Sequence, residues 1–225
     1  MRILCLSTRR KQLVAVSFDR AGEDLPLGDE LPPARRLDSA GLLLLDRGTA
    51  EEAGLAPGTE LTEEALLTLI ERSDFARAKS RALWLLSGRD YATAELSQKL
   101  APDFGRAAAC AAARRMEELG LINDEAYAAR LAEQLLFVKK VSARDAIYQM
   151  TARGLPRETV EQAVETLSPD PAEQLRELIE QKYRHSLSDE KGVRRVTAAL
   201  ARRGFSYGDI RAALRPYLSE EMEDW

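Results

Sequence analysis

The sequence ELGLINDEAYA, residues 118–128, contains a helix end followed at once by a helix start. Gly120 can adopt the left-handed conformation that commonly ends a helix, and the apolar residues Leu121 and Ile122 then pack back against that end. Asn123 or Asp124 caps the next helix, because a short polar side chain can accept hydrogen bonds from the first free amides. Two helices joined this closely predict a helical array around the junction.

The sequence from Phe75 onward has the composition of such an array. β-Branched residues are few, Ala, Leu, Arg and Glu are abundant, and apolar residues recur at spacings of three and four. Helix-breaking residues separate segments of roughly 10 to 16 residues, a usual helix length in globular proteins. These breakers are Gly88, Pro102, Gly105, Gly120, Gly154, Gly192 and Gly204.

The helical region repeats with a period of about 50 residues, as in tandem-repeat proteins. Apolar residues coincide at this offset, and so do two glycines at predicted helix ends; the matching sets are Leu96, Ala146 and Val196, then Leu100, Met150 and Leu200, then Gly154 and Gly204. The period predicts three units of three helices each, at residues 75–122, 123–168 and 169–218, that gain stability by stacking. An accidental match between amphipathic stretches is the alternative interpretation.

The first 74 residues differ from this pattern and predict a β-rich module. Arg2–Ser7 and Gln12–Phe18 are rich in Ile, Leu and Val and form a predicted hairpin, and Leu42–Leu45 is a further short strand. Thr62 begins a helix whose first turn carries two glutamates, so the module, residues 1–74, ends in a helix. Residues 219–225 form an acidic tail.

The composition excludes several classes of protein. The chain has 225 residues, of which 45% are hydrophobic and 31% charged, so it can bury a core. Two cysteines, Cys5 and Cys110, and one histidine, His185, are too few for a disulfide scaffold, a cysteine-built zinc site or a Ser-His-Asp triad. No nucleotide-binding or nucleophile-elbow motif occurs. We therefore predict a protein without catalytic residues, metal or cofactor.

The sequence also predicts a cytoplasmic protein that does not enter a membrane. Its longest apolar runs, such as Leu42–Leu45, are far shorter than the roughly 20 residues of a membrane-spanning helix. The first residues become polar at Ser7, before the apolar core of a signal peptide could form.

The junction at 118–128 resembles that of the RecX family, which are bacterial regulators of the RecA recombinase. The first helical unit is similar to the family's opening pattern at Ala82, Leu83, Leu86, Ser87, Arg89, Glu95, Leu96, Lys99 and Leu100. Residues 57–64, PGTELTEE, are similar to the strand-to-helix transition of members with an N-terminal extension. The resemblance implies a mainly α fold, with three tandem three-helix repeats in an elongated, curved array after a small β-rich module with one helix.

The same resemblance implies a function and a partner. Members bind RecA, above all its nucleoprotein filament, and damp its ATPase, strand-exchange and co-protease activities. No catalytic residue belongs to the family. A body made of stacked triplets is much longer than wide, and such a body is suited to lying along a filament groove.

Charge is divided unevenly along the chain, although its formal total is only −4. Residues 1–74 hold 9 basic and 14 acidic side chains, whereas residues 75–218 hold 24 and 19. Basic side chains in the second and third units could meet either DNA phosphates or an acidic protein surface. These candidates are Lys139, Lys140, Arg144, Arg153, Lys191, Arg194, Arg195, Arg202, Arg203, Arg211 and Arg215.

Other interpretations stay open from the sequence alone. Three-helix units resemble helix-turn-helix domains in outline, so sequence-specific DNA binding is one alternative, and a helical scaffold for another protein partner is a second. Direct DNA contact is compatible with the RecA interpretation as well, and we take an elongated monomer as the default. The aromatic residues of the array recur at helical spacing and predict core or junction packing, with Trp84 half-buried and Cys110 as a small buried group. These aromatics are Tyr127, Phe137, Tyr148, Tyr183, Phe205, Tyr207 and Tyr217.

Overall fold

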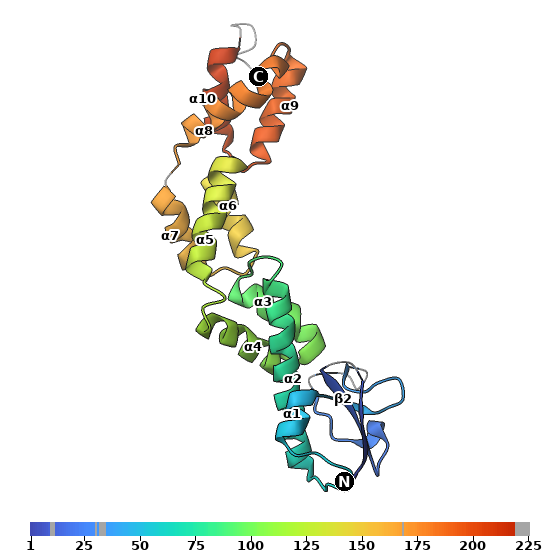
Figure 1. Ribbon diagram of the computed structural model, residues 1–225. Coiled ribbons are helices and arrows are strands. Elements are labelled where there is room, and N and C mark those ends of the chain that lie inside the picture. The colour runs from blue at the N-terminus through green and yellow to red at the C-terminus, as the bar shows by residue number, and fades with distance from the viewer. Residues whose placement is uncertain (10–11, 30, 32–34, 168, 219–225) are drawn as a thin grey trace. The chain divides into compact units, whose positions relative to one another are not determined.

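The computed structural model describes residues 1–9, 12–29, 31, 35–167 and 169–218 (Figure 1). Contacts divide the chain into two compact units, Met1–Asn123 and Asp124–Trp225, here called unit 1 and unit 2. The predicted fold class is confirmed, because a small three-stranded sheet precedes sets of three helices. The predicted acidic tail at 219–225 lies outside the described residues.

Unit 1 begins with an antiparallel sheet of β1 (Ile3–Thr8), β2 (Leu13–Phe18) and β3 (Leu43–Asp46), in that order. The first two strands form the predicted hairpin, with Thr8 opposite Val14, and the third is the predicted short strand. A 3₁₀ turn, η1, covers Gly22–Asp24. The alternate residues Val14, Val16, Leu43 and Leu45 belong to the core cluster that includes α2 residues, and Ala15, on the other face of β2, is buried as well.

Two helices complete the module. Helix α1 (Arg47–Glu52), a short helix containing Gly48, was not predicted from the sequence. Its start is set by Asp46, whose Oδ2 accepts a hydrogen bond of 2.9 Å from the amide of Thr49. Helix α2 (Glu63–Leu86) starts after Thr62 as predicted, with the Thr62 hydroxyl 3.1 Å from the amide of Ala65.

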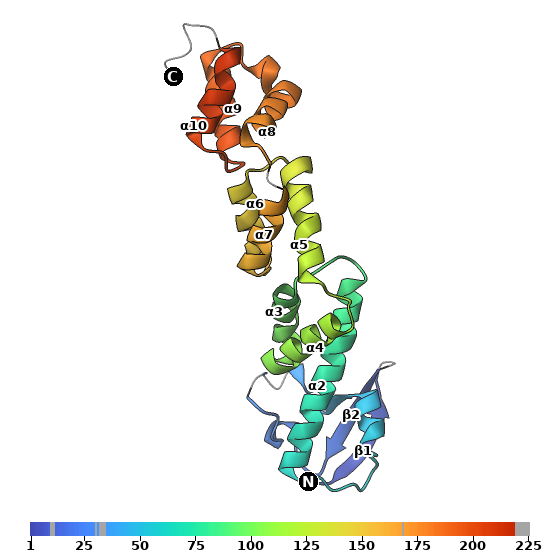
Figure 2. The same ribbon diagram turned by 90° about the vertical axis from the view of Figure 1, so that its left-hand side faces the viewer.

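Helix α2 belongs to two cores at once. Its first half packs Leu66, Leu69 and Ile70 against the sheet. Its second half packs Ala78, Ala82 and Leu85 against α3 (Thr93–Phe104) and α4 (Arg106–Glu118), and together these form the first triplet. Figure 2 shows α2 running from beside the sheet to α3 and α4. The sequence predicted a module boundary at 74/75, and the structure has one unbroken helix across that position.

Unit 2 contains two further helix triplets. The second triplet consists of α5 (Asp124–Glu133) with its π-helical extension η3 (Gln134–Val138), α6 (Ala143–Thr151) and α7 (Arg157–Leu167). The third triplet consists of α8 (Pro171–Leu178), continued by the π-helical η4 (Ile179–Tyr183) and the 3₁₀ turn η5 (Arg184–Ser186), then α9 (Glu190–Ala201), α10 (Tyr207–Leu214) and the 3₁₀ turn η6 (Arg215–Tyr217). Leu175, Leu178, Val196, Leu200 and Ile210 form much of the third core.

Glycines end helices where the sequence predicted them. Gly120, Gly154 and Gly204 have φ values of 69°, 83° and 86°, the left-handed region that side chains other than glycine rarely adopt. Each chain reversal therefore occurs without strain, and the next helix of the set can start within a few residues. Within the described residues, no helix combines the length and the apolar character needed to cross a bilayer.

Candidate partner-binding surface

Helix α9 presents its cations on the side opposite the core. Val193, Val196 and Leu200 are buried, and the exposed residues lie between them at spacings of three and four. This exposed stripe contains Lys191, Arg194, Arg195 and, just past the helix end, Arg202. The amphipathic pattern of the helix therefore places these positive charges on one face.

Two of the predicted residues lie outside the helix that the sequence assigned to them. Helix α9 ends at Ala201, so Arg202 is its C-cap and Arg203 lies in the following turn. The reason is Gly204, three residues after Ala201, because its left-handed backbone conformation reverses the chain and ends the helix at Ala201. Arg202 is exposed, whereas Arg203 is only partly so.

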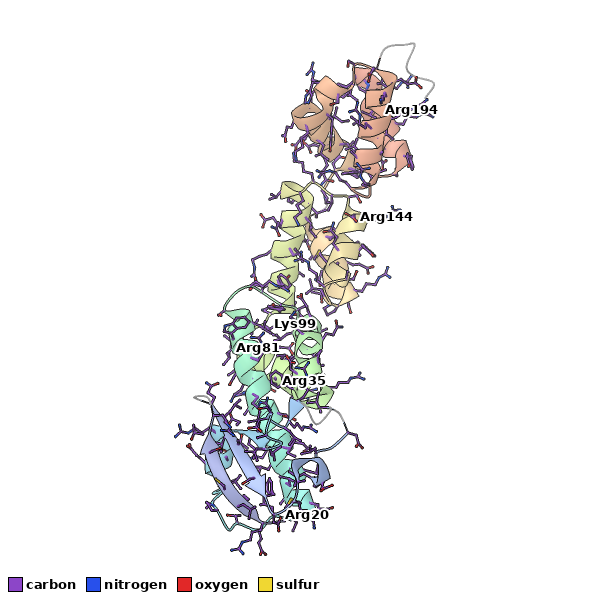
Figure 3. The ribbon with its side chains drawn as sticks, turned by 90° about the vertical axis from the view of Figure 1, so that its right-hand side faces the viewer. Arg20, Arg35, Arg81, Lys99, Arg144 and Arg194 are labelled. Atoms are coloured by element: carbon purple, nitrogen blue, oxygen red, sulfur yellow. The ribbon has the colours of Figure 1, made fainter. Side chains whose placement is uncertain are left out.

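The second triplet adds cations near the start of α6. Lys139 precedes this helix, Arg144 lies in its first turn, and both side chains are exposed. The amide of Ser142, the N-cap of α6, donates a hydrogen bond of 2.9 Å to the carbonyl of Arg203. This bond brings the start of α6, with Arg144, next to the end of α9, with Arg202. Figure 3 shows Arg144 and Arg194 on the same side of the unit.

We call these exposed residues the basic surface: Lys139, Arg144, Lys191, Arg194, Arg195 and Arg202. Arg194 forms an ion pair with Glu190, one turn earlier on α9. The other five make no ion pair within the described part of the chain. Cations that are solvated in this way are available to an anionic partner.

Three predicted residues serve the fold instead. Lys140 pairs with Glu177, Arg203 donates to main-chain carbonyls of the second triplet, and Arg153 donates to the Tyr127 hydroxyl at 3.1 Å. Arg211 on α10 and Arg215 at the start of η6 are exposed one helical turn apart, on a different element from the stripe of α9.

The predicted packing of the aromatic residues is correct for some and wrong for others. Tyr127 and Phe205 are buried, at 8% and 4% exposure, but Tyr148 and Tyr207 are each 72% exposed. Tyr148 lies four residues after Arg144, on the exposed side of α6, because Ala146 and Met150 already fill the buried positions. Tyr148 lies between Ala146 and Met150, the apolar positions of the 50-residue repeat in this helix. This placement was the signal in the sequence that Tyr148 would be exposed.

Two further sequence predictions are wrong in unit 1. Trp84 is 62% exposed, with the guanidinium of Arg81 4.1 Å from the centre of its ring. Cys110 is exposed on α4, and its sulfur lies 3.1 Å from the Ser97 hydroxyl. Both residues lie on helix faces that the core of the first triplet does not use.

These features define a class of protein. Its triplets are stacked helices, and the chemistry they present in unit 2 is a set of exposed cations on helix faces. No group of three His, Cys, Asp or Glu side chains among the described residues could hold a metal ion. The class is that of helical-repeat proteins with exposed positive charges on their helix faces.

Comparison with known proteins identifies the family. The family model described as "RecX, third three-helix domain" matches residues 170–214, which coincide with α8–α10. "Regulatory protein RecX" of Streptomyces coelicolor is 30% identical over 157 residues, covering 68% of this chain and 84% of that protein. A protein of the same name from Thermus thermophilus is 33% identical over 133 residues, covering 59% of this chain and 87% of the relative.

Solved structures agree on the fold. A crystal structure of regulatory protein RecX superposes with a TM-score of 0.59 at 18% identity and covers 95% of this chain and 98% of its own. The crystal structure of RecX from Lactobacillus salivarius gives a TM-score of 0.52 at 22% identity, covering 64% and 96%. The chain belongs to the RecX family of regulatory proteins.

Proposed function

We propose that this chain binds the RecA recombinase, above all its DNA-bound filament, and damps its ATPase, strand-exchange and co-protease activities. The observation that carries this proposal is family membership along most of the chain, since the match to the Streptomyces relative covers 68% of this chain and 84% of that protein. The tandem triplets and the basic surface support it, because a filament that contains DNA is a long polyanion.

The basic surface is our candidate for the contact. Exposed cations on α6 and α9 raise the rate of encounter with a polyanion and neutralise charges once docked. Because Arg can bind both carboxylates and phosphates in bidentate geometry, the same side chains can meet an acidic RecA surface or DNA itself. The remaining predicted residues, Arg211 and Arg215, extend the candidate set on α10.

The primary test is ATP hydrolysis by RecA on single-stranded DNA, with and without this chain at sub-stoichiometric ratio. Suppression of hydrolysis supports the proposal. No suppression, together with selective binding to one duplex sequence, would instead favour a helix-turn-helix DNA-binding protein. A chain that responds to neither RecA nor nucleic acid would be a scaffold for another partner.

A matched pair of triple variants tests the surface. Reversal of Arg144, Arg195 and Arg202 to Glu should weaken filament binding at least tenfold and leave the circular dichroism spectrum unchanged. The control reverses the exposed Arg157, Arg176 and Arg184 of the same unit, so the change in net charge is equal. Equal weakening by both variants would mean that total charge, and not this surface, determines binding.

A further inference from the structure

The first helix of the second triplet ends in an unusual way. In η3 the amide of Lys139 bonds to the carbonyl of Gln134 at 2.9 Å, and the amide of Val141 bonds to the carbonyl of Leu135 at 3.1 Å. Such wide turns are rare and occur often at functional positions. The last carbonyls of a helix have no donor within the helix, and they need partners from elsewhere.

The third triplet supplies these partners. Gln174 of α8, only 7% exposed, donates from Nε2 to the carbonyl of Leu136 at 2.8 Å. Arg203 donates from Nη1 to the carbonyl of Lys139 and reaches that of Lys140 at 3.4 Å. A cation at this position also complements the negative end of the helix dipole.

The backbones of the two triplets meet at the same place. The bond from the Ser142 amide to the Arg203 carbonyl sets the C-terminal end of α9 against the N-terminal end of α6, so the two helix dipoles meet with opposite partial charges (Figures 1 and 2). A Cβ on Gly204 would lie 2.6 Å from the Cβ of Asp145 and would also overlap the Ser142 hydroxyl. Only glycine permits this approach.

Lys140 shows how much the local conformation depends on these contacts. Its φ of 52° is the one positive value among the described residues other than glycine. Residue types other than Gly, Asn and Asp seldom adopt this conformation unless the neighbouring structure holds them in it. Here the ion pair to Glu177 of α8 and the Arg203 guanidinium at its carbonyl hold the residue from the third triplet.

We propose that these contacts join the second and third triplets into one rigid body, and that Arg203 is the residue that positions the two halves of the basic surface. This proposal rests on the function proposed above. Lys139 and Arg144 come from the second triplet, and the α9 stripe comes from the third. A fixed geometry lets both halves engage one partner without a further loss of conformational entropy.

The repeat itself provides a contrast. Arg153 occupies the position in the second triplet that Arg203 occupies in the third, at the 50-residue offset. Its guanidinium is bound to Tyr127 of its own triplet. Arg203 therefore bridges two triplets, whereas the equivalent residue Arg153 does not have this role.

The test compares adjacent arginines in the full chain. Arg203→Met removes the donor but keeps most of the side-chain length, Arg203→Lys keeps the charge, and Arg202→Met is the control with the same loss of charge. Spin labels are placed at the exposed residues Glu165 on α7 and Ala212 on α10, after Cys5 and Cys110 have been replaced by Ser. Pulsed dipolar spectroscopy then measures the distance distribution between the triplets, and hydrogen exchange reports on the Ser142 amide.

We expect Arg203→Met to broaden the distance distribution, to speed exchange at Ser142 at least tenfold and to weaken filament binding three- to tenfold. Arg203→Lys should recover part of each effect. Arg202→Met should leave the distribution and the exchange unchanged, and it should reduce the slope of log affinity against log salt by about one.

The outcomes separate the two proposals. An unchanged distance distribution in Arg203→Met would overturn the rigid junction. A broadened distribution with unchanged filament affinity would overturn the positioning role. If the wild-type chain does not bind RecA at all, the proposed function and the positioning role both fail, whereas the distance measurement still decides whether Arg203 holds the triplets together.

Discussion

The chain joins neighbouring parts in two different ways. In unit 1 the segment before β3 is held to the middle of α2, the helix shared by both cores, through a buried ion pair, in which Nη2 of Arg36 lies 2.9 Å from Oδ2 of Asp74 and the side chains are 7% and 5% exposed. In unit 2 the second and third triplets meet through side chains that bind the carbonyls at a helix end. The first contact is between two charges in the interior, and the second is between a helix end and its neighbours.

The two kinds of contact should differ in how they respond to the loss of a single side chain. A buried charge that loses its partner has neither water nor a counter-ion, so a single change there is severe. A helix end has several carbonyls and several donors, and the loss of one donor leaves the others in place. Unit 1 should therefore be sensitive at one residue, whereas the junction of unit 2 should lose stability in smaller steps.

The largest expected effect is at Asp74. Asp74→Asn leaves the buried Arg36 without its counter-ion, and Arg77, whose Nη1 lies 3.6 Å from Asp74, loses it too. Burial already lowers the pKa of the Arg77 guanidinium. We expect the free energy of unfolding to fall by about 3–5 kcal/mol, seen as faster hydrogen exchange in β2.

The control is Arg47→Met, which breaks the exposed ion pair with Glu51 and should lower the free energy of unfolding by about 0.5 kcal/mol or less. Similar losses in the two variants would contradict the expected sensitivity of the buried pair.

Two glycines test the close approach in unit 2. Gly120 and Gly204 both have positive φ, but a Cβ on Gly120 would meet nothing within 4 Å. Gly120→Ala should cost about 1–2 kcal/mol from backbone conformation alone. Gly204→Ala should cost about 2–4 kcal/mol, because the methyl group also overlaps α6. Urea unfolding of the two variants measures the difference, and equal losses would show that the triplets can separate freely.

Removal of Gln174 tests one donor of the junction. Gln174→Leu leaves the buried carbonyl of Leu136 without this donor, which should cost about 1–3 kcal/mol in urea unfolding. The control is Gln149→Leu, since Gln149 is partly exposed and bonds to Asp145 at 2.8 Å within its own helix. We expect the control to change stability by about 0.5 kcal/mol or less. A larger loss in the control would remove the distinction between the junction and an ordinary surface bond.

The smallest effects are those of pH. The amide of Leu42 lowers the pKa of Asp38 in unit 1, and the hydroxyl of Tyr217, 2.8 Å away, lowers the pKa of Glu180 in unit 2. Both carboxylates stabilise the fold above their ordinary pKa values, and this stabilisation is lost as the pH falls through the lowered ones. Melting temperatures measured from about pH 6 to pH 2 should decline less in Asp38→Asn and Glu180→Gln. An unchanged decline in both would assign the acid sensitivity to other groups.

Much of the fold could be predicted because its signals are local. The hairpin strands, the start of α2 at Thr62 and the glycine ends at 120, 154 and 204 depend on residues within a few positions of each other. The errors are of another kind. Helix α1 depends on Asp46 at the end of a strand, and the unbroken α2 depends on two cores that each bury one half of it. Neither cause lies within one short window of sequence.

The candidate surface was likewise predictable from the sequence only in part. The sequence predicted the cations of α6 and α9, because helical spacing alone places them opposite the apolar residues. It could not separate the exposed Arg202 from Arg203, which differ by one position and carry the same charge. That separation depends on carbonyls more than 60 residues earlier, at Lys139 and Lys140.

The helical triplets, their period and the family can all be recognised from local patterns, since spacing, caps and glycines act over short distances along the chain. Which charges are buried with a partner, which cap a neighbouring helix and which remain in solvent depends on the folded arrangement. The free energy of a charge is set by its surroundings. Those surroundings are assembled from segments far apart in sequence, as Arg36 with Asp74 and Arg203 with Lys139 show.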